Sequence, residues 1–240
     1  LSTLEDYVKA LPYFEKAIQL DPRYTRAHAW LAAMYWNLWN EDWQASLGMT
    51  ADEAIENLEY HLEAAMTEPT PMAHYVAAAL FAAQGRYEKA IAESNLAILL
   101  NPNSAIGYKG LGRILNKAGR PAEGLEVIQR ASRLDPRGDD GGDDTYRIGE
   151  SLFLLGRYDE AAKMFLRYIN RSGDEEWGSL LLAANYAQLG RTKEAKAAVA
   201  RFDEIRAKRG LRPYTLAEFD DWPFAPTVRE QYRESLRKAG

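Results

Sequence analysis

The chain has 240 residues, 47% hydrophobic and 27% charged, which are ordinary values for a globular protein and exclude disorder throughout the chain. A net charge of −5 and a pI of about 5.4 disfavour a general nucleic-acid binder, which usually carries a basic stripe. The absence of cysteine excludes disulfides, thiolate zinc sites and thiol nucleophiles.

Helical periodicity runs through most of the chain. In 71–84, for example, apolar residues recur at spacings close to i, i+3, i+4 and i+7, which is typical of one face of a helix. Read in chain order, the sequence predicts helices over 4–20, 25–40, 51–67, 71–84, 87–100, 105–118, 121–134, 143–155, 158–170, 176–189 and 192–208. In the tail 211–240, Thr215 to Glu218 form a capping box, and a last helix begins at Thr227.

A Gly-Arg pair recurs at the turns between these helices, with its glycines at 85, 119, 156 and 190, spaced 34, 37 and 34 residues apart. Glycine after a helix end can adopt positive φ, so each pair indicates a tight turn. Leu-(Asp/Asn)-Pro strings ending at Pro22, Pro102 and Pro136 indicate helix stops. One unit of about 34 residues is therefore helix, turn, helix, turn.

This pattern resembles the tetratricopeptide repeat (TPR) family. First-helix matches are Leu31, Ala32, Tyr35, Leu111, Gly112, Ile148, Gly149, Leu182, Ala183 and Tyr186, and second-helix matches are Ala10, Phe14, Ala17, Pro22, Ala161 and Phe165. The resemblance implies an all-α fold, a right-handed α-solenoid superhelix of about five and a half hairpins with a C-terminal capping helix. The predicted division is an array over 1–210 (half repeat 1–24, long repeat 25–70, repeats 71–104, 105–138, 142–175 and 176–209) and a capping tail over 211–240.

A narrower similarity links the insertion and tail to TPR regions that follow class III adenylate/guanylate cyclase domains in bacteria. It rests on segments such as Tyr35–Trp39, His61–Ala65, Asn185–Arg191 and Leu236–Gly240. The resemblance implies a bacterial, cytoplasmic protein. No cyclase catalytic segment is present in the sequence, so the resemblance implies no enzyme activity.

The first predicted helix matches the second helix of a repeat, with no first helix before it. Since the chain begins at Leu1 rather than Met, we expect a fragment of a longer protein. The apolar stripe of Tyr7, Leu11, Phe14 and Ile18 then lacks its natural partner helix, and large exposed apolar patches usually mark contacts. A homo-oligomer through this helix is therefore one hypothesis.

The second unit carries an insertion of about 13 residues, rich in tryptophan. Trp36, Trp39 and Trp43 follow i, i+3, i+7 spacing, which predicts an aromatic face on an extended helix. These rings either cover the inserted loop or form an anchor pocket for a partner, because tryptophan is enriched in binding hot spots. Thr50 to Glu53 is a capping box that begins the next helix.

The sequence contains no recognisable catalytic or metal-binding motif. The acidic link 137–144 departs from a calcium loop, because Gly141 occupies a ligand position and Asp144 stands where that loop needs glycine. His28, His61 and His74 lack the i, i+4 spacing of a metal pair and are interpreted as packing residues. We expect neither a cofactor nor a metal, and the basic stretch 201–212 is interpreted as a solvated face.

The predicted binding surface is the concave face, which the first helices of TPR hairpins line. The candidate partner-binding residues are Arg26, Trp36, Tyr75, Lys109, Arg113, Asn116, Tyr146 and Arg147. A carboxylate of the partner is expected near Lys109 and Arg113, an i, i+4 cationic pair, unless these two cations pair only with carboxylates of the neighbouring repeat.

The sequence thus predicts a non-catalytic interaction module that binds a peptide or helix of a partner, or of its own fused domain. The alternative is a structural self-association module with no peptide ligand. The partner is expected to be a protein rather than a nucleic acid, and no apolar run is long enough to span a membrane.

Overall fold

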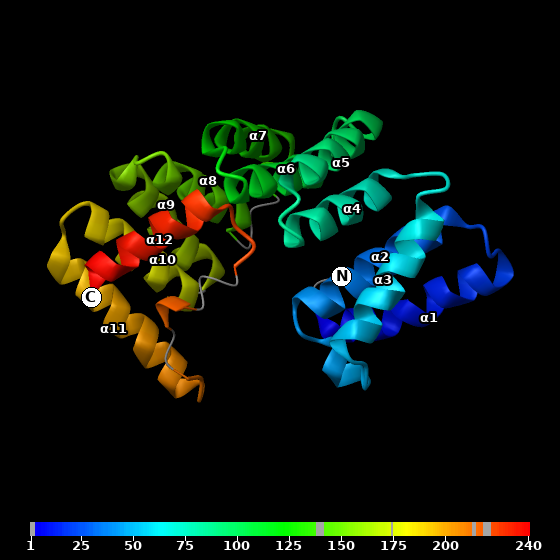
Figure 1. The fold of residues 1–240 in the computed structure, drawn as a ribbon, viewed down its shortest axis with the longest axis horizontal. Coiled ribbons are helices and arrows are strands. Elements are labelled where there is room, and N and C mark those ends of the chain that lie inside the picture. Colours follow the sequence, from blue (N-terminus) through cyan, green and yellow to red (C-terminus); the bar gives the residue numbers. More distant parts are fainter. Residues whose placement is uncertain (1–2, 138–141, 174, 213–214, 218–221) are drawn as a thin grey trace. The chain divides into compact units, whose positions relative to one another are not determined.

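The computed structural model describes residues 3–137, 142–173, 175–212, 215–217 and 222–240, and those residues contain α-helix but no β-strand. The helices are α1 Leu4–Leu20, α2 Thr25–Asn40, α3 Ala51–Ala65, α4 Pro71–Ala83, α5 Tyr87–Leu100, α6 Ala105–Lys117, α7 Pro121–Leu134, α8 Asp143–Leu154, α9 Tyr158–Ser172, α10 Glu175–Gln188, α11 Thr192–Lys208 and α12 Pro226–Ala239, with a short 3₁₀ helix, η1, at Gln44–Leu47 (Figure 1). Each predicted helix is present with its ends within two residues of those expected. The all-helical solenoid class is confirmed.

The chain forms two compact units, Leu1–Asn103 and Ser104–Gly240. The expected division into an array over 1–210 and a capping tail over 211–240 stays a prediction. The tail belongs to the second unit because α12 buries Val228, Tyr232 and Leu236 in that unit's core.

Consecutive helices pair as hairpins within each unit. The pairs are α2–α3 and α4–α5 in the first unit, and α6–α7, α8–α9 and α10–α11 in the second. Successive hairpins stack, with α7 against α8 and α9 against α10. Because a two-helix hairpin cannot bury its apolar face alone, this stacking is what creates a core.

The Gly-Arg turns close most of these hairpins in the same way. Gly85, Gly119, Gly156 and Gly190 have φ between 69° and 76°. The amide of the following arginine donates back into the helix just ended, as from Arg157 to the carbonyl of Leu152 at 2.8 Å. Such a left-handed residue satisfies carbonyls that a helix end otherwise leaves without a donor.

In the α2–α3 hairpin, an aspartate takes the position that glycine holds in the other turns. Asp42 has φ 56°, and the amide of Trp43 donates to the carbonyl of Leu38 at 2.8 Å. Helix α2 therefore ends at Asn40, and Trp43 lies beyond a turn. The prediction of one extended helix carrying all three tryptophans is wrong, because aspartate tolerates the left-handed conformation and ends the helix without glycine.

The tryptophans of the insertion pack inside the first unit. Trp36 is buried, its ring lies 5.4 Å from that of Trp39, and Trp43 makes an edge contact with Tyr7 at 5.7 Å. These contacts favour the interpretation in which the rings cover the inserted loop. The capping box at Thr50 is confirmed, since its hydroxyl accepts from the amide of Glu53 and the Glu53 carboxylate accepts from the amide of Thr50.

The apolar stripe of α1 also has a partner within the molecule. Tyr7 is buried, Leu11 and Ile18 pack against the core of the first unit, and Phe14 stacks on Trp30 of α2 at 6.1 Å. The stripe is therefore largely covered within the molecule, which removes the reason given for self-association through it. The exposed large apolar side chains of α1 lie off this stripe; they are Val8, Tyr13 and Leu20.

Candidate functional site

Helices α6, α8 and α10 are the first helices of the hairpins of the second unit, and first helices are the ones expected to line the inner surface. A segment of the same chain contacts all three. Helix α12 packs mainly on α10 and reaches α6 and α8 near their C-terminal ends (Figure 1). Its largest contact is with the first helix of the last hairpin, α10, and its contact with α11 is small. We call residues 222–239 the docked tail.

The start of the docked tail is fixed at the end of α6. The amide of Ala225 donates to the carbonyl of Lys117 at 2.8 Å, and the Lys117 Nζ lies 5.5 Å from the centre of the Phe224 ring. A cation over an aromatic face is attracted by the ring's negative electron density. Burial, with help from Arg113 and Arg147, lowers the pKa of the Lys117 ammonium to about 8.

The middle of the docked tail places Tyr232 against α8. Its ring stacks on Phe153 with centroids 4.8 Å apart, and only 2% of Tyr232 is exposed. Burial raises the pKa of its phenol well above the ordinary value, and Glu150 adds to that rise. The neighbouring Gln231 donates to the carbonyl of Phe153 at 3.2 Å. The docked tail therefore contacts both the ring and the backbone of Phe153.

The docked tail meets α10 through two further side-chain pairs. Trp222 makes an edge contact with Trp177, their centroids 5.7 Å apart. Gln188 donates to the hydroxyl of the buried Ser235 at 2.6 Å. The inner surface therefore holds a helix by aromatic rings and by polar groups at defined positions.

Lys109, one of the two predicted cations, forms an ion pair with a carboxylate of the same chain. Its Nζ lies 2.8 Å from Oδ1 of Asp144 in the first turn of α8, and the other carboxylate oxygen accepts from Ser132. Asp144 is nearly fully buried. This is the pairing with the neighbouring repeat that the sequence left open as the alternative role of Lys109.

Arg113 differs from Lys109, since no hydrogen bond or ion pair joins its guanidinium to another residue in the described part of the chain. It is half-buried, and it lies close enough to Lys117 to lower that lysine's pKa. A cation without a carboxylate partner, beside a second cation, is the stronger candidate for an incoming anion.

Asn116 is fully buried and joins adjacent repeats. Its amide Nδ2 donates to Glu150 Oε2 at 3.1 Å and to the carbonyl of Arg147 at 3.2 Å, while its Oδ1 accepts from Ser151 at 2.9 Å. Any influence of Asn116 on a partner thus passes through the residues of α8 that it positions.

Tyr146 and Arg147 lie on α8 beside this network. The Arg147 guanidinium carbon is 4.6 Å from the Tyr146 ring centre, and its Nη1 is 3.7 Å from Glu150. Burial raises the pKa of the Tyr146 phenol, with Glu150 adding to it. Both residues lie near Tyr232 of the docked tail.

The remaining predicted residues belong to the first unit. Trp36 is buried among the insertion tryptophans, and Tyr75 is half-buried on α4. Arg26 is exposed and lines a polar hollow of about 570 Å³, together with residues that include Tyr24 and Glu68. A single segment crossing Tyr75 and Tyr146 stays a prediction.

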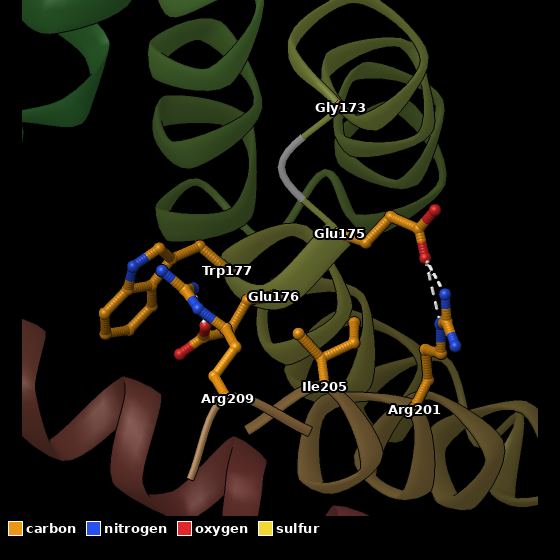
Figure 2. A pocket seen from close by; sticks show the side chains of 7 residues that line it. All are labelled: Gly173, Glu175, Glu176, Trp177, Arg201, Ile205 and Arg209. Carbon is orange, nitrogen blue, oxygen red and sulfur yellow. Dashed lines mark hydrogen bonds and ion pairs between the residues drawn. The ribbon is translucent and has the colours of Figure 1, made fainter. Parts of the chain in front are cut away.

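A separate pocket of about 580 Å³ lies between the start of α10 and the end of α11 (Figure 2). Its charges pair with one another, Arg201 with Glu175 and Arg209 with Glu176. Arg206 also reaches Glu176, at 3.0 Å. The basic stretch is therefore largely neutralised by carboxylates.

The histidines are used in packing contacts. Nδ1 of His28 lies 3.0 Å from Nδ1 of His61, whose ring stacks on Tyr35, while His74 lies 2.6 Å from Glu93. Within the described ranges, no group of three or more His, Asp or Glu side chains is placed to hold a metal. None of the described helices has the length and hydropathy needed to cross a bilayer.

Sequence reasoning missed the docked tail as part of this surface. The sequence predicts that the last helix caps the array, but not that residues 222–239 contact the ends of α6 and α8. The available signal was the apolar face of that helix, together with Trp222 and Phe224 ahead of it, because a surface helix rarely needs so many aromatic residues.

Comparison with known proteins gives a consistent assignment. Tetratricopeptide repeat models match residues 51–105 and 110–176, more than half of the chain, and residues 1–24. The small glutamine-rich tetratricopeptide repeat-containing protein 2 of Mycosarcoma maydis is 29% identical over 124 residues, which is 52% of this chain but only 33% of that relative.

Two solved structures illustrate the likeness in fold. PilW, described as a widely conserved type IV pilus biogenesis factor, has a TM-score of 0.65 at 18% identity, over 87% of this chain and 88% of its own. YrrB, described as a TPR protein with an unusual peptide-binding site, has a TM-score of 0.52 at 18% identity, over 81% of this chain and 92% of its own.

Proposed function

Because this chain belongs to the tetratricopeptide repeat family, whose members generally mediate protein–protein interactions, we propose that it is a non-catalytic interaction module. It binds a peptide or helix of a protein partner on the inner surface of its hairpins. The observation that carries the proposal is the docked tail, because it is a helical segment held on the inner surface of α6, α8 and α10 by aromatic and polar contacts. The peptide-binding site named for YrrB, a protein of similar fold, agrees with this role.

The partner's charge is proposed from Arg113. The cations Arg113, Lys117 and Arg147 lie near one another on α6 and α8, and their mutual repulsion contributes to the lowered pKa of Lys117. An acidic side chain or a C-terminal carboxylate of the partner would relieve that repulsion. Under the narrower resemblance to cyclase-associated repeats, the partner is a domain fused to this chain.

The test is photo-crosslinking followed by affinity measurement. A photoreactive side chain at position 113 should capture a partner from cell extract, whereas the same group at the exposed Glu126 of α7 should not. For the captured protein, Arg113→Glu should weaken binding at least tenfold. Arg133→Glu, the same charge change at an exposed position of α7, should leave the affinity unchanged.

Equal loss of affinity in both charge variants would mean that only net charge matters. An unchanged affinity for a folded Arg113→Glu protein would move the binding surface elsewhere, with the tryptophan insertion as the next candidate. The alternative function, self-association without a peptide ligand, is separated by sedimentation across a range of concentrations, where a monomer throughout excludes it.

A further inference from the structure

The position of α12 is unusual for a helix that only closes a solenoid. A terminal cap covers the apolar face of the last hairpin by packing as the next helix of the stack would. In this chain α12 packs mainly on α10 and touches α11 little, while the chain just ahead of it bonds to the end of α6. The docked tail as a whole therefore contacts α10 along its length and the C-terminal ends of α6 and α8, instead of extending the series.

Helix α12 has one buried apolar face and one exposed charged face. One face of α12 carries Val228, Tyr232 and Leu236 at four-residue spacing, and all three are buried. The other face carries exposed charged side chains, including Glu230, Glu234 and Arg237. Helix-in-groove recognition uses this division, with apolar anchors on one face and a solvated opposite face.

Specific polar contacts fix how α12 is aligned along the helices on which it packs. Gln231 donates to the carbonyls of Phe153 and Leu154, and Ser235 accepts from Gln188. Each contact joins the docked tail to the C-terminal end of an inner helix. A sliding of α12 by one turn would break them together, so the surface selects one alignment of a helix.

We propose that residues 222–239 are a displaceable occupant of the partner-binding surface, which a partner helix with the same pattern replaces. This proposal rests on the proposed function. The partner helix carries an aliphatic, an aromatic and an aliphatic side chain at four-residue spacing, with an aromatic residue ahead of its first turn to meet Lys117. Because the tail is tethered, its effective concentration is on the order of millimolar, and the free protein is predominantly closed.

This closed state has a measurable consequence for affinity. A ligand that needs the open surface binds with an apparent dissociation constant raised by the inverse of the open fraction. Weakening the tail therefore strengthens the binding of a competing helix. A fixed structural tail would do the opposite or nothing, because its loss would only destabilise the surface.

The probe is a fluorescein-labelled synthetic peptide of residues 222–240, titrated into the full chain and followed by fluorescence anisotropy. It should bind the Tyr232→Ala protein at least tenfold more tightly than the wild-type protein. A peptide with serine in place of Tyr232 should bind neither protein. Glu230→Ala, a change on the exposed face of α12, should behave as wild type.

Equal or weaker binding of the labelled peptide to a folded Tyr232→Ala protein overturns the proposal. If that variant does not fold, hydrogen–deuterium exchange of the unaltered chain decides instead. If the tail opens by itself, the amides of α12 should exchange at least tenfold faster than those of α8 and α10. If the amides of α12 exchange only as fast as those of α8 and α10, the proposal is overturned. Neither measurement needs a partner protein. A result that shows a fixed tail would therefore overturn this proposal without deciding whether the chain binds a partner elsewhere.

Discussion

Glycines at the contact between paired helices set how closely those helices approach. A Cβ added at Gly112 would lie 2.3 Å from Cγ1 of Ile128, and one at Gly149 would lie 2.8 Å from Cε1 of Phe165. Both contacts are far inside the separation that carbon atoms tolerate, and Ile128 and Phe165 are fully buried side chains. The small residues of the repeat motif are therefore required by packing.

Gly112→Leu should lower the free energy of unfolding by ~1–3 kcal/mol or more, because the added side chain overpacks the α6–α7 contact. Urea denaturation followed by circular dichroism measures the change. Ala122→Leu adds a side chain at an exposed position of α7 and serves as the control. Equal urea midpoints for Gly112→Leu and wild type would contradict the close packing of Gly112 against Ile128.

His61 links stability to pH. Burial, and to a smaller extent His28, lowers the pKa of its imidazole from 6.5 to about 4. The unfolded chain then binds more protons than the folded chain between these values, so His61 contributes stability above pH 6.5 that is lost as pH falls towards 4.

Between pH 7 and pH 5, wild type should therefore lose at most ~2 kcal/mol more stability than His61→Gln, in which this group cannot titrate. Thermal melts of both proteins across this range give the difference. Parallel stability curves for the two proteins would contradict the assignment to His61. A titration of the His61 ring by NMR provides an independent check.

At the scale of elements, helix starts are stabilised locally. Arg120, Arg157 and Arg191 each precede a helix and pair with the glutamate three residues later. Such exposed pairs contribute little to stability, but the glutamates also lie near the positive ends of their helices. The Thr50 capping box acts in the same place through hydrogen bonds to two backbone amides.

Thr50→Ala should cost about 1 kcal/mol, because α3 loses the hydroxyl that accepts from the amide of Glu53. The matched control is Thr192→Ala at the start of α11, where the hydroxyl is not an N-cap. Chemical denaturation compares the two. The cap explanation fails if both variants lose the same stability.

At the scale of the whole molecule, each of the two units has its own buried core. One core cluster of the second unit contains residues from Leu125 to Ala239, including Phe153, Phe165 and Phe202, with α12 contributing Tyr232. A segment with its own core meets the usual requirement for folding alone. The boundary between Asn103 and Ser104 lies one residue from the predicted boundary between the repeats 71–104 and 105–138.

A fragment of residues 104–240 should therefore fold by itself, with a helical circular dichroism spectrum and a cooperative thermal transition. A matching fragment of residues 104–211, without α12, should melt at a lower temperature because Phe153 loses its contact with Tyr232 and Trp177 loses its contact with Trp222. A broad, non-cooperative transition for the 104–240 fragment would mean that the second unit depends on the first for its stability.

The sequence alone determined the helices, the hairpin turns and the Thr50 cap. These features depend on interactions between residues a few positions apart, such as helical periodicity, positive φ at Gly156 and the reach of a hydroxyl to the third amide. The sequence did not predict the turn at Asp42, because this turn places an aspartate in the left-handed region where the other hairpin turns have a glycine.

Only the tertiary structure decided which inner residues are engaged and by what. Lys109 pairs with Asp144, Asn116 with Glu150, and Tyr232 stacks on Phe153, and each of these contacts joins residues about 34 or more positions apart. Such pairs depend on how hairpins stack and where the last helix docks, and the free energy that selects them comes from the burial of the whole unit. The periodicity of a single helix shows that an apolar face exists, but not which surface will cover it.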